Sequence, residues 1–249
     1  MTYCLALKVD SGLLLASDSR TNAGVDHINT YSKLRIFDDA PDRTLVLLSA
    51  GNLATTQAVS NRLQRDLEDS RSKVNLHKLD YMFDAAEYIG QISRRAQSLT
   101  GPDQSSVNTR ASFILGGQIQ GQPPRLYLIY PEGNYIQASS SAPFLQIGET
   151  KYGKPILDRL VHKGLSLDDA ARLALVSIDS TRRSNVSVGP PFEVAYYERD
   201  RLQLTRTLSF DRDDPHFVRL CDQWGEALEQ SFSVLPTFDW EDGGKSPDA

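Results

Sequence analysis

The first hydrophobic segments of the chain follow the pattern of a β-hairpin. Residues 2–9 and 13–17 are largely apolar, and the turn-forming residues Asp10, Ser11 and Gly12 separate them. Two further apolar runs, residues 33–37 and 44–49, predict two more short strands. The second residue of the chain is therefore predicted to enter a sheet, which is unusual because chain ends are frayed unless something ties them down.

Helical periodicity follows. Apolar residues recur at three- and four-residue spacing over about residues 53–70, which predicts an amphipathic helix, and a second helix is predicted over about residues 79–99. Strands return at residues 111–117, 126–130, 135–138 and 144–147. The last elements predicted are helices over about residues 154–162 and 167–182, a hairpin of residues 192–198 and 202–207, and a helix over about residues 214–232. The apolar residues of that last helix, Val218, Leu220, Trp224 and Leu228, are expected to pack on the sheet.

The order of these elements bears on the fold class. Strands and helices come in blocks rather than in the strict alternation of a parallel doubly wound sheet. Blocks of this kind favour two antiparallel sheets packed together, with helices on their outer faces. We see no linker-like stretch in the first 235 residues, so we expect one domain over residues 1–235. A mobile, acidic tail is expected over residues 236–249, which are rich in Asp, Gly and Pro.

Charge and composition exclude several classes of protein. The chain has 27 basic and 32 acidic residues and a net charge of -5, which predicts no basic surface for nucleic acid or anionic lipid. Its start lacks the pattern of a secretion signal, and no apolar run reaches the roughly 18–20 residues of a membrane span. Cys4 and Cys221 form no metal or disulfide framework, and Cys4 is expected to be a small buried hydrophobe. These features predict a cytoplasmic protein without cofactor, metal, membrane or nucleic-acid partner.

Thr2 is the first candidate for chemistry. The small side chain after Met1 favours removal of the initiator methionine, which would leave Thr2 at the N-terminus. A hydroxyl is a weak nucleophile until a base takes its proton, and the α-amine of the same residue can be that base. Its reference pKa of about 8 suits this role. Because Thr follows Met in many proteins with no catalytic meaning, Thr2 alone does not establish a nucleophile.

Three more residues gain meaning from their places beside predicted strands. Asp18 ends the second strand, so hairpin pairing would return it to the same end of the sheet as Thr2. Lys33 opens the third strand, where Asp18 could orient its ammonium and the positive charge would lower the proton affinity of nearby groups. Gly51 lies between a strand and a helix, where a backbone N–H can meet developing negative charge. Taken singly, each is better explained as an ordinary surface or turn residue.

Taken together, these residues resemble the proteasome β-subunit branch of the N-terminal nucleophile hydrolases. The likeness covers about residues 2–207 and includes Thr2, Asp18, Lys33 in Lys-Leu-Arg-Ile, Ser-Ala-Gly at 49–51, Phe-Ile-Leu-Gly-Gly at 113–117 and Ile-Gly-Glu at 147–149. Thr-Tyr-Cys at 2–4, Arg-Thr-Asn-Ala-Gly at 20–24 and Arg-Ser-Asn-Val-Ser-Val-Gly-Pro-Pro at 183–191 resemble the bacterial ancestral β-subunit group, Anbu. The longer C-terminal portion also fits that group.

The resemblance implies an α+β fold, a four-layer αββα sandwich of two antiparallel sheets, and cleavage of peptide or other amide bonds through an acyl-enzyme on Thr2. It implies the catalytic residues Thr2, Asp18, Lys33, Gly51 and Ser187. It also implies a substrate pocket lined by Thr21, Tyr31, Arg35, Ser49 and Leu53, which would favour acidic or polar side chains. A homo-oligomer, as a ring or an open helical turn, is expected, with no cofactor and no metal.

Two positions depart from the family pattern. Ser184 stands where a carboxylate is expected, and Glu149 stands where a serine is expected. In the parent family both lost groups support the terminal amine. Glu149 is either a substitute negative charge or a salt-bridged surface residue. The alternative function is therefore a ring-forming structural or adaptor subunit with little or no peptidase turnover.

Overall fold

Two antiparallel sheets, each of five strands, pack face to face in the computed structural model, which describes residues 2–22, 28–98, 108–238, 240 and 241. The first sheet has the order β10-β1-β2-β11-β12 and contains β1 Tyr3–Val9, β2 Gly12–Asp18, β10 Phe144–Gly148, β11 Phe192–Glu198 and β12 Arg206–Phe210. The second has the order β5-β6-β7-β8-β9 and contains β5 Leu34–Phe37, β6 Arg43–Gly51, β7 Ala111–Ile119, β8 Arg125–Ile129 and β9 Tyr135–Gln137.

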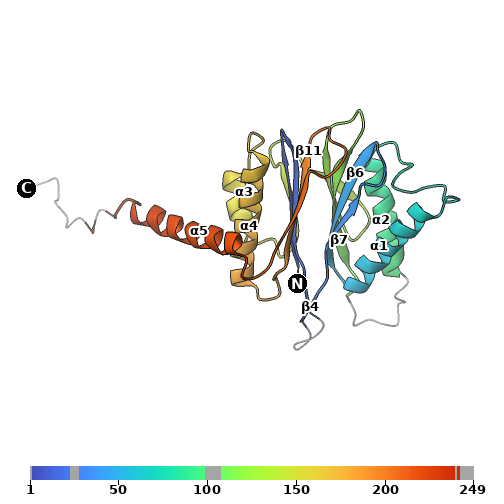
Figure 1. Ribbon diagram of the computed structural model, residues 1–249. Coiled ribbons are helices and arrows are strands. Elements are labelled where there is room, and N and C mark those ends of the chain that lie inside the picture. The colour runs from blue at the N-terminus through green and yellow to red at the C-terminus, as the bar shows by residue number, and fades with distance from the viewer. Residues whose placement is uncertain (1, 23–27, 99–107, 239, 242–249) are drawn as a thin grey trace, which may run out of the picture.

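Helices cover the outer faces of both sheets and complete four layers (Figure 1). The second sheet is covered by α1 Leu53–Glu68 and α2 Met82–Ser98, and the first by α3 Lys154–Leu160 and α4 Leu167–Ser184. The predicted αββα fold class is confirmed. Two further elements are a short hairpin of β3 Arg20–Asn22 and β4 Ile28–Thr30, and the last helix, α5 Pro215–Ser233. None of the described helices combines the length and apolarity that crossing a membrane requires.

Strand β1 is apolar on both faces because each face meets a different apolar layer. Its alternate residues Tyr3, Leu5 and Leu7 belong to the core cluster shared with α4, while Cys4 and Ala6 belong to the cluster between the two sheets. A third cluster lies between the second sheet and helices α1 and α2. Side chains on a strand alternate between its faces, so a nearly continuous apolar run is what a strand buried on both sides needs.

The start of β1 is held by strands on both sides. Pairing with β2 matches Cys4 with Ser17, and pairing with β10 matches Tyr3 with Gly148. The Glu149 N–H donates to the Thr2 carbonyl at 2.8 Å. Gly148 has φ 86°, and a Cβ there would lie 1.9 Å from the Thr2 carbonyl oxygen, so glycine is required for this close approach. The first strand therefore fixes the backbone of Thr2, as the sequence predicted.

The last hairpin differs from the prediction. Strand β12 covers Arg206–Phe210 instead of residues 202–207. Asp200 and Leu202 have φ values of 65° and 55°, which are left-handed conformations incompatible with a strand. The connection is therefore a wider loop, and pairing with β11 starts later. The sequence pattern also missed the β3–β4 hairpin, because its strands are too short to show a periodicity.

Helix boundaries were predicted more closely. Ser166 caps α4 as expected, since its hydroxyl accepts from the Asp169 N–H at 3.0 Å. The helices α1 and α3 end slightly earlier than predicted, α2 begins later, and α4 continues to Ser184.

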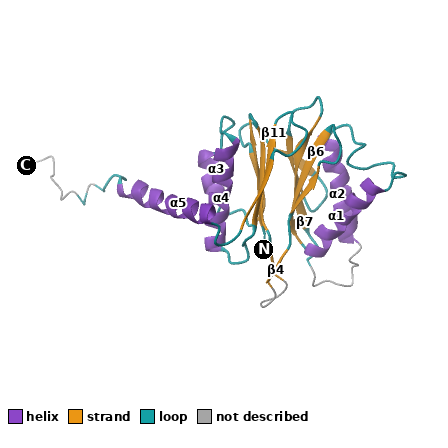
Figure 2. Cartoon of the chain, in the orientation of Figure 1, coloured by secondary structure: helices purple, strands orange, loops and turns teal. Residues whose placement is uncertain are grey.

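Helix α5 does not pack along the sheet as we predicted. Only its first turns are anchored, through buried Phe217 and Cys221, and the Phe217 ring lies 5.0 Å from that of Phe192. Leu228 is 51% exposed and Phe232 76% exposed. Figures 1 and 2 show the helix leaving the layered body, so the packing prediction is wrong for its second half. Of the predicted tail, residues 236–238, 240 and 241 are described and exposed, and the others lie outside the described residues.

A chain that ends at Gly225 is expected to remain folded. The removed part of α5 is exposed throughout, and surface changes of this kind alter the free energy of unfolding by about 0.5 kcal/mol or less. By contrast, Phe217→Ala in the full chain removes a buried ring and is expected to cost about 3–5 kcal/mol. Urea unfolding of both variants checks this, and aggregation of the truncated chain would contradict it.

Candidate active site

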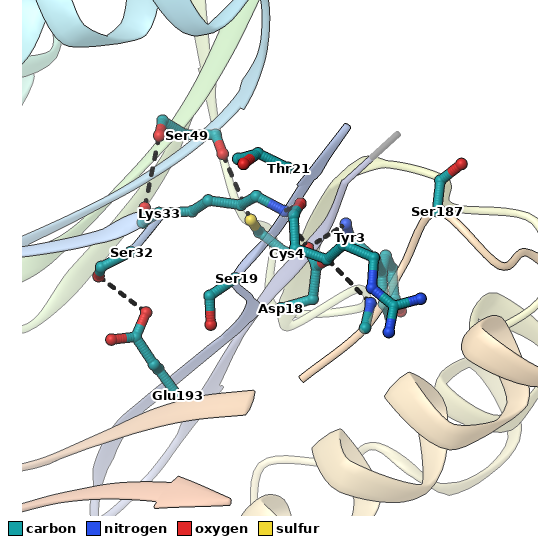
Figure 3. A network of polar contacts seen from close by, with 12 residues as sticks. Tyr3, Cys4, Asp18, Ser19, Thr21, Ser32, Lys33, Ser49, Ser187 and Glu193 are labelled. Carbon is teal, nitrogen blue, oxygen red and sulfur yellow. Dashed lines mark hydrogen bonds and ion pairs between the residues drawn. The ribbon is translucent and has the colours of Figure 1, made fainter. Parts of the chain in front are cut away.

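The Asp18 carboxylate joins the segments around Thr2. The β1–β2 register pairs Cys4 with Ser17, so Asp18, the next residue of β2, lies at the end of the sheet where Tyr3 and Thr2 lie. Asp18 is fully buried, and its Oδ1 accepts from the Tyr3 N–H at 3.0 Å and from Lys33 Nζ at 2.6 Å. Its Oδ2 accepts from the Gly189 N–H at 3.1 Å. Figure 3 shows this network, in which three separate segments donate to one carboxylate.

The Lys33 ammonium is also held by more than one acceptor. Besides Asp18, its ammonium donates to the Arg20 carbonyl at 2.7 Å, and its side chain is only 6% exposed. Burial raises the pKa of the Asp18 carboxyl, while the Lys33 ammonium and the two backbone N–H donors oppose that rise. The predicted pairing of Asp18 with Lys33 is therefore present as a buried ion pair beside the start of β1.

The direction of the Gly51 N–H follows from the ladders on either side of β6. The Ser49 N–H donates to the Lys33 carbonyl on the β5 side at 3.0 Å, while the Asn52 N–H donates to the Arg110 carbonyl on the β7 side at 2.9 Å. Successive N–H groups of a strand point to opposite sides, so the Gly51 N–H points toward the β5 side, as that of Ser49 does. Pairing of β5 with β6 begins only at Leu34, opposite Leu48. The Gly51 N–H therefore points beyond the start of β5.

Gly51 must also be a glycine. Its φ is 118°, and a Cβ would lie 2.3 Å from the Arg110 carbonyl oxygen. A substitution at this position would strain the backbone in addition to any effect on a ligand.

A cleft of about 630 Å³ brings three of the predicted catalytic residues together, namely Thr2, Lys33 and Gly51. Four of the predicted substrate-binding residues also line it: Thr21, Tyr31, Ser49 and Leu53. Arg35 lies outside the lining, but its guanidinium donates to the Tyr31 hydroxyl at 3.0 Å. Its influence on the cleft would therefore pass through Tyr31.

Ser187 is beside the cleft and not in its lining. Its backbone N–H donates to Asn185 Oδ1 at 3.0 Å, and in Figure 3 its hydroxyl points away from Lys33. Ser184, the other position in this segment that we considered, is the exposed last residue of α4. Neither hydroxyl lines the cleft as the structure stands.

The buried Cys4 thiol is not a competing nucleophile. It donates to the Ser49 carbonyl at 3.5 Å, and burial raises the pKa of this thiol well above its ordinary value. Since the thiolate is the reactive form, Cys4 is a buried apolar residue, as its position in the sequence predicted.

Sequence reasoning gave no role to Arg20. It lines the cleft, and its guanidinium donates to the Val186 carbonyl at 2.6 Å and packs against Gly189. Arg20 therefore holds the loop whose Gly189 N–H binds Asp18. No local pattern signals a contact between residues so far apart in the chain.

Glu193 was also missed. Its carboxylate accepts from the Ser32 hydroxyl at 2.8 Å, next to Lys33, and burial raises its pKa. A signal was available here, because Glu193 is the one charged residue in the apolar run 192–197.

Two sheets between two helical layers, with Thr2, the residue just before β1, beside a buried Lys–Asp pair, define the N-terminal nucleophile hydrolase fold. A family model described as "Proteasome subunit" matches residues 2–197, so the chain belongs to the proteasome subunit family.

Solved structures point to one group within this family. A Gly-1 mutant of Anbu from Hyphomicrobium sp. strain MC1 is 46% identical with a TM-score of 0.89, and the match covers 96% of this chain and 100% of that one. Anbu, the ancestral beta-subunit, from Yersinia bercovieri is 44% identical with a TM-score of 0.89, covering 95% and 98%. A structure described as the helical assembly of the Anbu complex from Pseudomonas aeruginosa is 44% identical with a TM-score of 0.90, covering 95% and 98%. The search of curated proteins found no match.

Asp18→Leu is expected to destabilise the protein more than Lys33→Met. Removing Asp18 leaves a buried ammonium and two backbone N–H groups without their acceptor, and breaking a buried pair in this way costs about 3–5 kcal/mol. Lys33→Met leaves a carboxylate that still accepts two N–H groups, so the loss is smaller. The free energy of unfolding in urea measures the difference.

The matched control for this pair is Asp158→Leu, which removes the partner of Lys154 on the exposed face of α3. An exposed pair contributes about 0.5 kcal/mol or less, so little change is expected. Equal losses for Asp18→Leu and Lys33→Met, or the reverse order, would contradict the role assigned to Asp18.

Proposed function

We propose that the chain is a threonine-type hydrolase that cleaves peptide or other amide bonds, with Thr2 as its nucleophile once Met1 is removed. The observation that carries this proposal is that Thr2, Lys33 and Gly51 line one cleft. Asp18 holds the Lys33 ammonium there through a buried ion pair. Membership of the proteasome subunit family supports a hydrolase. The cytoplasmic location expected from the sequence is part of the same proposal.

The proposed reaction begins with attack of Thr2 Oγ1 on the substrate carbonyl carbon. The free α-amine of Thr2, directly or through a water, takes the hydroxyl proton, and the Lys33 ammonium lowers the proton affinity of the oxygen. The Gly51 N–H donates to the carbonyl oxygen as it becomes negative, an interaction worth about 3–4 kcal/mol per donor. The C–N bond then breaks, the leaving amine takes the proton, and an ester remains on Thr2.

Water completes the cycle. The α-amine of Thr2 takes a proton from the water as its oxygen attacks the ester carbonyl carbon. The C–O bond to Thr2 breaks, the acid product departs, and the Thr2 hydroxyl is restored. The chain's own residues supply every proton transfer in this sequence.

The substrate side chain would lie against Thr21, Tyr31, Ser49 and Leu53. Tyr31 carries the Arg35 guanidinium above its ring, 5.7 Å from the centroid, and Arg20 also lines the cleft. These groups favour an acidic or polar side chain next to the cleaved bond.

Homo-oligomerisation is a further part of the proposal. The structure from Pseudomonas aeruginosa is described as a helical assembly, and its chain matches this one over nearly its full length. The exposed apolar residues at and just beyond the end of α5, among them Leu228, Phe232 and Leu235, offer a surface for a second copy in a ring or an open helical turn.

A structural or adaptor subunit with little turnover is the second candidate. The observation that favours it is that Ser184, which stands where the family pattern has a carboxylate, is exposed at the end of α4, and that Ser187 is not in the cleft lining. In that case the chain would act by assembling into oligomers, and the cleft would have little or no peptidase turnover.

An epoxyketone should modify Thr2 of the purified chain and should not modify Thr2→Ala. Intact mass must first show that Met1 has been removed, because only the free amine can act as the base. Thr207→Ala, an exposed threonine on β12, is the matched control and should label like the wild type. A retained Met1, or equal labelling of Thr2→Ala, would rule out Thr2 as the nucleophile.

Replacing Leu228 and Phe232 together by Glu should reduce the oligomer to smaller species that stay folded. Both side chains are exposed, so the fold does not depend on them, whereas charges would oppose burial against a neighbour. Sedimentation velocity and circular dichroism measure the two effects, with Gln230→Glu as the control on the same helix. An unchanged mass would place the interface elsewhere.

A further inference from the structure

We propose that Glu149 is a positioning residue for Thr2, binding the terminal α-amine of Thr2 through its carboxylate. This inference rests on the proposed function. It assigns a role to the group that stands where the sequence pattern expects a serine.

The backbone places Glu149 next to Thr2. The register of β1 with β10 matches Tyr3 with Gly148, and one step further the Glu149 N–H donates to the Thr2 carbonyl at 2.8 Å. This hydrogen bond brings the backbones of the two residues together just beyond the ends of β1 and β10. A glutamate side chain starting from this position is within reach of the amine of the same Thr2.

Because the Glu149 carboxylate is buried, its charge must be stabilised by hydrogen-bond donors. Its side chain is 6% exposed, and a buried carboxylate without hydrogen bonds is strongly unfavourable. Oε2 accepts from Asn185 Nδ2 at 3.0 Å, while Oε1 lies 3.7 Å from Lys151 Nζ, whose side chain is 75% exposed. That second contact is longer than a hydrogen bond and is made by a solvated ammonium, so Oε1 keeps acceptor capacity for one close donor.

Asn185 holds the other oxygen of the carboxylate in place. It is the C-cap of α4, where its N–H donates to the Thr181 carbonyl at 2.9 Å, and its Oδ1 accepts from the Ser187 N–H at 3.0 Å. The Asn185 side chain is therefore held while it donates to Glu149. This leaves Glu149 anchored through Oε2, while Oε1 has only the long contact with Lys151.

The other charges around Thr2 explain why an additional anion matters. Lys33 and Arg20 line the cleft, and Lys151 lies beside Glu149. The negative charge of Asp18 already binds the Lys33 ammonium and the N–H groups of Tyr3 and Gly189. Cations near an amine lower its pKa and a nearby carboxylate raises it, so Glu149 would keep the proton affinity of the Thr2 amine high enough for a base.

The test measures the pKa of the terminal amine itself. A chain that starts at Thr2 is released from a cleavable N-terminal fusion, so the amine exists however Met1 is processed. Its rate of acetylation by acetic anhydride is followed against pH by mass spectrometry of the N-terminal peptide. Glu149→Gln should lower the pKa of the amine by about 1 unit, and Glu149→Asp should retain part of the wild-type value.

Two controls separate this role from a structural one. Glu132→Gln removes the same charge from an exposed position paired with Arg110 and should leave the amine unchanged. Lys151→Gln removes the exposed cation and should leave the amine pKa the same or slightly higher. If Glu149 only supported the fold, Glu149→Gln would lower the thermal midpoint and leave the amine pKa where it is.

The outcomes distinguish this inference from the proposed function. An amine pKa that is the same in wild type, Glu149→Gln and Glu149→Asp overturns the inference, while epoxyketone labelling of Thr2 in those chains would still support the hydrolase. Absence of labelling in a Thr2-initiated wild-type chain, together with the expected pKa shift, overturns the hydrolase and supports the contact between Glu149 and the amine.

Discussion

The buried Asp18 carboxylate is the interaction on which the arrangement around Thr2 depends. It accepts hydrogen bonds from β1, from Lys33 at the start of β5 and from Gly189 in the loop before β11, so one side chain joins parts of both sheets. Burial disfavours its charge, and three donors offset that cost only while all three segments are in place. The position of the Lys33 ammonium beside Thr2 is therefore a consequence of how the sheets pack.

The positions of some of these residues could be predicted from local pattern, whereas their roles came only from the resemblance to the proteasome family. The apolar runs on either side of Asp10-Ser11-Gly12 fix the register of the first hairpin, and that register alone brings Asp18 to the end of the sheet where Thr2 lies. The place of Gly51 between a strand and a helix was also visible. The two-sheet, four-layer order followed from the blocks of strands and helices.

The remaining features depend on contacts between distant segments, which periodicity does not encode. Arg20 meets Val186 and Gly189 only after the sheets have formed, and Leu202 takes a left-handed conformation that its residue type does not suggest. The apolar pattern of α5 predicted packing on the sheet, which is correct for Leu220, a residue that packs against the core, but not for the exposed Leu228. An apolar stripe on a helix indicates that this face packs against another surface. The stripe does not indicate whether that surface belongs to the same chain or to a neighbouring one.

The ladder around β1 has one more physical consequence for a chain that begins at Thr2. A terminal residue is normally mobile, yet β1 lies between β2 and β10, and its hydrogen bonds use the Tyr3 N–H and the Thr2 carbonyl. The amine and the hydroxyl of Thr2 are the two groups of that residue which these bonds leave unused. A nucleophile and its base can therefore be held rigidly by the backbone without either of them being consumed by the fold, which is the preorganisation that an intramolecular proton transfer requires.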